Sequence, residues 1–114
     1  MLVIRQAQLS ALADAKRRAF EDRCASFLRT TWPEDHEQLG EDELRGLVRE
    51  RSARAADFGL TTERDIQRFL NLSALLGHDF EWQPRNEWIV TLLRDSTIPF
   101  PGKLEIIYRV LGSG

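Results

Sequence analysis

The chain has little cysteine and no long apolar run. Cys24 is the single cysteine among 114 residues, so no disulfide can form within the chain, and this usage suits a reducing compartment. No apolar run approaches the roughly 18 residues that indicate a transmembrane helix. The first five residues, Met1 to Arg5, lack the apolar region of a signal peptide. We therefore expect a cytoplasmic protein that does not enter a membrane.

Neither sign of charge is in clear excess, since 16 Lys and Arg face 18 Asp and Glu and the net charge is −2. No global field therefore draws the chain to nucleic acid or to acidic membranes. The hydrophobic share of 42% and the charged share of 30% are typical of a globular protein. The length suits one domain. We expect a single domain over residues 1–111, and residues 112–114 are interpreted as a flexible tail or a cloning remnant.

Helical periodicity dominates the pattern. Apolar residues recur every three or four positions, and glycines and prolines separate the stretches. The run Leu2-Val3-Ile4 favours β structure and is expected to be an extended lead-in, and residues 95–102 are expected to be non-helical because they contain Pro99 and Pro101. The predicted fold class is all-α, a compact single-domain bundle of about five helices around a central apolar helix. The predicted helices cover about residues 6–29, 33–38, 41–58, 62–76, 86–94 and 104–111.

The central helix is predicted after a turn at Gly59, because glycine accepts the left-handed conformation that ends a helix. Thr61 or Thr62 is expected to cap the next helix with its hydroxyl, Thr62 having the spacing of a capping box with Asp65, and Gly77 is expected to end it. A helix that is apolar over so much of its circumference is normally surrounded by others. The residues that make it so are Ile66, Phe69, Leu70, Leu72, Ser73, Leu75 and Leu76.

No motif in the chain indicates catalysis. His36 and His78 are far apart and neither has a metal-ligand neighbour at helical spacing. Cys24 lies on an apolar stripe, where cysteine usually acts as a small hydrophobe. Glycine-rich phosphate loops and nucleophile elbows are absent. We expect no catalytic residue, no metal site and no cofactor.

Nucleic-acid binding is a further alternative, because residues 44–76 read as a helix, a tight turn and a second helix, the layout of helix-turn-helix domains. The second helix offers only Arg64, Gln67 and Arg68 to a groove and is otherwise too apolar. Without a basic surplus, the phosphate contribution to affinity is missing. A nucleic-acid partner is therefore not expected.

Protein binding remains. Aromatic side chains in or beside the connectors are candidate interface anchors, since aromatic residues are enriched at binding hot spots. They can equally close the ends of a small helical core. The core role is favoured for Trp88, which is in register with Leu92, and the two roles are evenly balanced for Phe80 and Trp82. The candidate interface residues are Phe80, Trp82, Trp88 and Trp32.

Charge is also divided along the chain. Residues 31–43 carry six acids and no Lys or Arg, whereas basic residues predominate in residues 44–54. Such a division can steer a charged partner, although more often it marks a solvated face. The candidate electrostatic contacts are Glu34, Asp35, Arg45 and Arg49.

The segment Gly59-Leu60-Thr61-Thr62-Glu63-Arg64-Asp65-Ile66 resembles a family of small bacterial proteins encoded beside type VI secretion spike, adaptor and effector genes. The likeness extends over most of the chain, although Ser96 stands where family members tend to have a proline, which affects the turn rather than the fold. The other matching residues are Phe27, Pro33-Glu34, Leu39-Gly40-Glu41, Arg54-Ala55-Ala56, Phe58, Arg68-Phe69-Leu70-Asn71-Leu72, Gly77-His78-Asp79-Phe80, Pro84-Arg85, Trp88, Leu92-Leu93, Asp95 and Pro101 to Tyr108.

The resemblance implies a non-enzymatic accessory protein. The nearest role is that of a co-adaptor, or co-chaperone, that binds a larger effector-specific adaptor and helps to load a toxin onto the spike. The effector itself or a spike-tip protein is a further possible partner. The alternative is an immunity protein that blocks a toxin, with the acidic residues between Glu34 and Glu43 facing a basic nuclease.

Overall fold

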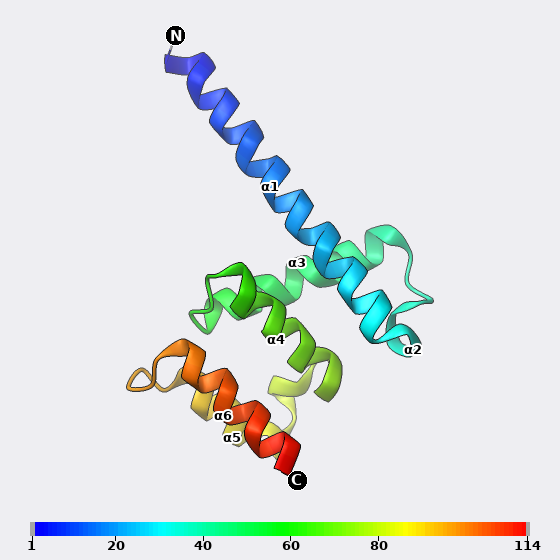
Figure 1. Cartoon of the computed structure of the whole chain (residues 1–114), viewed down its shortest axis with the longest axis vertical. Helices are drawn as coiled ribbons and strands as arrows, with labels where there is room; N and C mark the ends of the chain where they lie inside the picture. The colour runs from blue at the N-terminus through cyan, green and yellow to red at the C-terminus, as the bar shows by residue number, and fades with distance from the viewer. Residues whose placement is uncertain (1, 114) are drawn as a thin grey trace. The chain divides into compact units, whose positions relative to one another are not determined.

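The computed structural model describes residues 2–113, and all regular secondary structure in that range is helical (Figure 1). The all-α fold class is therefore confirmed. The α-helices are α1 (Leu2–Thr31), α2 (Pro33–His36), α3 (Glu41–Asp57), α4 (Glu63–Leu76), α5 (Glu87–Arg94) and α6 (Phe100–Ser113), and the short 3₁₀ helices are η1 (Phe80–Trp82) and η2 (Pro84–Asn86). None of the described helices combines the length and the hydropathy needed to cross a membrane.

Two helix starts differ from the sequence expectation. The helix α1 begins at Leu2, so the expected extended lead-in is helical and continues into the good helix formers that follow it. The helix α6 begins at Phe100, although residues 95–102 were expected to be non-helical. Proline lacks an amide proton, but the first turn of a helix needs none, so Pro101 fits there.

The chain divides into two compact units, Met1–Val48 and Arg49–Gly114, and the division falls inside α3. This division rests on contacts within the chain and does not concern whether the two units fold cooperatively. The single-domain assignment therefore stays a prediction. In the first unit, Arg45 of α3 pairs with Asp22 of α1, and Arg29 of α1 pairs with Glu41 of α3. The buried apolar residues of this unit are Cys24, Ala25, Leu28, Leu44 and Val48.

The core of the second unit is built around Phe69 of α4. Its ring centroid lies 5.9 Å from that of Phe58 and 5.7 Å from that of Phe80, in tilted arrangements that aromatic pairs prefer. The α3 segment within this unit, the turn between α3 and α4, the rest of α4, η1, α5 and α6 supply the other members. The full buried cluster is Ala55, Phe58, Leu60, Phe69, Leu72, Phe80, Ile89, Leu93, Leu104 and Ile107.

The ends of α4 follow the predicted chemistry. Gly59 has φ 88° and Gly77 has φ 108°, both in the left-handed region that favours glycine. The Thr62 hydroxyl oxygen accepts a 3.1 Å hydrogen bond from the amide of Asp65, as expected of an N-cap. One expectation is wrong: Leu75 is 46% exposed, so the apolar surface of α4 is not covered on all sides.

A buried ion pair fastens the connector after α4 to α3. Arg51 is fully buried and Glu81 has a side chain only 2% exposed, and their closest N–O distance is 2.6 Å. The Arg51 guanidinium also donates to the carbonyl of His78 and lies 5.4 Å from the centroid of the Phe69 ring. Arg51 belongs to the apolar stripe of its helix by periodicity, and this pairing explains how a charged side chain occupies that position.

A second buried cation joins α5 to α6. Lys103 is 1% exposed, and its Nζ donates a 2.9 Å hydrogen bond to the carbonyl oxygen of Leu93. Leu93 lies in the last turn of α5, where carbonyls have no partner within the helix. Tyr108 of α6 makes a similar link to α4, because its hydroxyl donates to the carbonyl of Arg68 at 2.7 Å. Polar bonds thus fix α6 from two sides.

Candidate functional site

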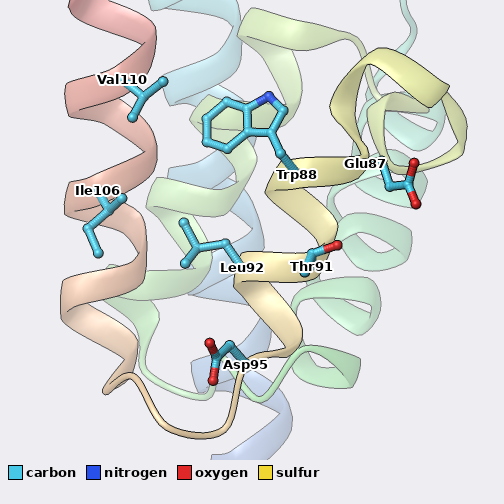
Figure 2. Close-up of a pocket in the computed structure, with 7 residues that line it drawn as sticks. All are labelled: Glu87, Trp88, Thr91, Leu92, Asp95, Ile106 and Val110. Carbon is cyan, nitrogen blue, oxygen red and sulfur yellow. The ribbon is translucent and has the colours of Figure 1, made fainter.

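The second unit has an open groove between α5 and α6, with a volume of about 560 Å³. Figure 2 shows the two helices side by side, with Trp88 and Val110 toward one end, Leu92 and Ile106 between them and Asp95 at the other end. Trp88 is 39%, Ile106 38% and Val110 48% exposed, so the lining is open to solvent. The lining residues are Glu87, Trp88, Thr91, Leu92, Asp95, Ile106 and Val110.

Helical periodicity creates this groove. On α5, Ile89 and Leu93 turn into the core, whereas Trp88 and Leu92, one position earlier in each case, line the groove. On α6, Ile107 is buried, and the neighbouring stripe of Ile106 and Val110 lies outside. Each helix therefore carries two adjacent apolar stripes, of which packing within the unit covers one.

Hydrogen bonds fix the conformation of the Asp95 carboxylate at one end of the groove. One Asp95 oxygen accepts hydrogen bonds from the hydroxyl of Thr97 at 2.6 Å and from its amide at 2.9 Å. These bonds, the hydroxyl bond above all, hold the pKa of Asp95 below its usual value of 3.8, and the charge of Lys103 acts in the same direction. Asp95 is therefore ionised at neutral pH.

Phe80, a candidate interface residue for which a core role was equally weighted, is a core residue. It is fully buried and packs against Phe69. Trp82, two positions later, points the other way and is 71% exposed, with the Arg54 guanidinium 4.8 Å from its ring centroid. The connector thus divides its aromatics between core and surface. The interface prediction for Phe80 is replaced by a core assignment, and that for Trp82 stays a prediction.

Trp88 lines the groove, although its register with Leu92 favoured a core role. Both residues line the groove, but Leu92 also packs against the core, whereas Trp88 is 39% exposed. Trp32 lies in the first unit and is half-buried. Its backbone carbonyl oxygen lies 2.8 Å from Nδ1 of His36. The groove lining includes neither Trp32 nor Trp82, so the structure does not gather the three tryptophans in this site.

The predicted electrostatic contacts differ in their surroundings. Glu34 and Asp35 are exposed in the first turn of α2, and Arg49 is exposed on α3. Arg45 pairs with Asp22 within the first unit, so Asp22 partly neutralises the charge of Arg45. These positions remain candidates for contacts with a partner, but none of them lines the groove.

Sequence reasoning missed Ile106 and Val110. The amphipathic pattern that predicts the last helix consists of Leu104, Ile107, Tyr108 and Leu111, and it leaves both residues out. The available signal was a second apolar pair, one helical turn apart and one position before the buried stripe. A helix with two such stripes has more apolar surface than one packing face can cover.

No group of three or more histidine, cysteine or acidic side chains that could hold a metal ion occurs in the described part of the chain. The groove instead offers apolar surface with carboxylates at its ends, which suits the binding of apolar side chains from another molecule. Comparisons with protein-family models, with curated proteins and with solved structures find no match. The resemblance to type VI accessory proteins therefore stays a prediction.

Proposed function

We propose that the chain is a non-enzymatic protein-binding accessory factor that acts in the cytoplasm and receives a partner protein in the α5–α6 groove. The observation that supports this proposal is the exposure of Trp88, Ile106 and Val110 on one continuous surface. A large aromatic residue among aliphatic neighbours, bordered by charged residues, has the composition of a binding hot spot.

The proposed partner is a larger effector-specific adaptor of type VI secretion, to which the chain would be a co-adaptor that helps to load an effector onto the spike. The support for this identity is the resemblance of the segment from Gly59 through Ile66, and of the other matching residues along the chain, to the type VI accessory proteins. The groove is consistent with a stoichiometric partner, because a rigid scaffold with one uncovered apolar surface can complete the surface of a second protein.

Capture of the partner from host cells tests the proposal, with two matched variants. Ile106→Asp puts a charge into the groove, and Leu75→Asp puts one on an exposed leucine of α4 outside the lining. We expect one protein, identified by mass spectrometry, to be retained by the wild type and by Leu75→Asp and to be lost with Ile106→Asp. Equal retention by both variants would show that the groove is not the interface.

The immunity role is the second candidate, and the exposure of the acidic residues Glu34, Asp35 and Glu37 favours it. Deletion of the gene separates the two roles. A co-adaptor is needed in the attacking cell for secretion of an effector, whereas an immunity protein protects the recipient. If the deletion removes recipient survival and leaves secretion intact, the co-adaptor proposal is wrong.

A further inference from the structure

The groove has a charge of one sign. Its lining holds two carboxylates, Glu87 and Asp95, and no Lys or Arg. Glu87 is the first residue of α5 and Asp95 directly follows its last residue, so the two lie eight positions apart, about 12 Å at 1.5 Å per residue. Figure 2 shows Glu87 beside Trp88 and Asp95 at the opposite end of the groove. An occupant that spans the groove therefore meets a negative charge near each end.

Lys103 acts on Asp95, but it is buried and donates to the Leu93 carbonyl, and the exposed charges beside the groove leave its sign unchanged. Glu105 and Arg109 are exposed on α6 and carry opposite charges, so together they add no net charge. Arg94, in the last turn of α5, lies with its guanidinium 5.7 Å from the centroid of the Phe58 ring and does not line the groove. The carboxylates of Glu87 and Asp95 therefore determine the preference of the site.

The shape of the groove fits a helix. Its apolar walls are residues one turn apart on each helix, Trp88 with Leu92 and Ile106 with Val110. Side chains at this spacing form ridges between which the side chains of a third helix can insert. Peptide helices that bind such grooves present apolar residues at positions i, i+4 and i+7. The Glu87–Asp95 span corresponds to about two helical turns.

We propose that the groove binds a basic amphipathic helix of the partner protein, with apolar side chains at helical spacing and a lysine or arginine near each end. This inference rests on the proposed function, and it names the chemistry of the segment that the partner inserts. The apolar residues contact Trp88, Leu92 and Ile106, and the flanking cations pair with Glu87 and Asp95. Charge complementarity of this kind selects partners and speeds their encounter.

Synthetic peptides test the inference on the full chain. One fluorescein-labelled peptide of about 18 residues, or five helical turns, contains leucines on one face, lysines at both ends and alanine elsewhere. A second replaces every lysine by glutamate, and a third keeps the composition but scatters the leucines. Fluorescence anisotropy measures binding and circular dichroism measures peptide helicity. We expect the basic peptide to bind about fivefold or more tighter than the acidic one, to gain helicity, and to lose this preference with added salt.

Two protein variants complete the design. Glu87→Lys should remove most of the preference for the basic peptide. Ile106→Asp should abolish binding of both peptides that carry leucines on one face. Both positions are exposed, and thermal unfolding confirms that each variant folds. Equal binding of the basic, acidic and scattered peptides overturns the inference, as does binding that Ile106→Asp leaves unchanged. Failure of every peptide to bind, while partner capture still depends on Ile106, also overturns it and leaves the proposed function standing. Basic-peptide binding without any Ile106-dependent partner refutes the proposed function alone.

Discussion

The Arg51 guanidinium holds the Glu81 carboxylate in a buried pair that bridges thirty positions of the chain. The terminal nitrogens of Arg51 lie 2.6, 2.9 and 3.2 Å from the Glu81 oxygens. The Nε of Arg54 lies 3.4 Å from the same carboxylate. Glu81 thus faces two cations inside the second unit, and the connector that carries Phe80 and Trp82 is anchored through it. Removal of Glu81 leaves the buried Arg51 with only the exposed Glu50 carboxylate, 3.8 Å away, as a counterion, and the loss of a buried partner is costly in a low-dielectric interior.

Glu81→Ala should therefore lower the free energy of unfolding by about 3–5 kcal/mol. The matched control is Glu50→Ala, because Glu50 lies 3.8 Å from the same arginine with a side chain 63% exposed. That change should cost less than about 1 kcal/mol, since exposed pairs contribute little. Urea unfolding measures both values. Similar costs for the two variants would mean that burial does not set the strength of the pair.

Replacing both partners of the ion pair tests whether the pair stabilises the fold more than apolar packing would. The double variant Arg51→Met with Glu81→Leu removes both charges and fills the space with apolar atoms. Its unfolding midpoint should recover most of what Glu81→Ala loses, because a buried ion pair is often no more stable than apolar packing of similar volume. A double variant as unstable as Glu81→Ala would instead show that the hydrogen bond to the His78 carbonyl is indispensable.

Two glycines should respond to alanine in opposite directions. Gly77 has φ +108°, and a Cβ there would lie 3.2 Å from Oδ1 of Asp79, so Gly77→Ala should destabilise the chain by more than about 1 kcal/mol. Gly46 lies inside α3 with no atom within 4 Å of an added Cβ, so Gly46→Ala should stabilise it by about 0.5–1 kcal/mol. Thermal unfolding of the two variants checks both signs, and equal shifts would contradict the backbone explanation.

Asp95 should contribute stability that depends on pH. Its pKa in the folded chain is held below 3.8 by the bonds from Thr97. A lowered pKa stabilises the fold above the unfolded value, and this contribution disappears as the pH falls through the folded value. The stability advantage of the wild type over Asp95→Asn should thus be constant near pH 7 and should shrink below pH 3.8. A difference that is independent of pH down to strongly acid conditions would refute this role.

Trp82 provides a test of the remaining hot-spot prediction. Its ring is 71% exposed and contacts the Arg54 guanidinium, so Trp82→Ala should cost only about 0.5–1 kcal/mol of stability. If Trp82 anchors the partner, the same change weakens binding by about 2 kcal/mol, or thirtyfold. Calorimetry and a binding titration on one variant measure both. A melting temperature that falls by several degrees with unaltered affinity would retire the interface role.

The helices and the two ends of α4 could be predicted because local chemistry specifies them, whereas the starts of α1 and α6 could not. Thr62 caps α4 and Gly59 ends the preceding helix through interactions within a few residues. The pairing of Arg51 with Glu81 could not be predicted, because it joins positions thirty residues apart. The same limit applies to the groove: periodicity identifies the apolar residues, but only the packing of α5 against α6 determines that Ile106 stays outside while Ile107 is buried. For the same reason the sequence left the choice between core and interface open for Phe80 and Trp82, and the structure buries Phe80 in the core.

The Lys103 bond to the Leu93 carbonyl has a kinetic consequence for any molecule that enters the groove. It ties α6 to the last turn of α5, so both walls are in place before an encounter. The protein then loses little conformational freedom on association, and the ordering cost falls on the incoming segment. Substitutions among the apolar lining residues should consequently change the lifetime of the complex, with only a small effect on how fast it forms.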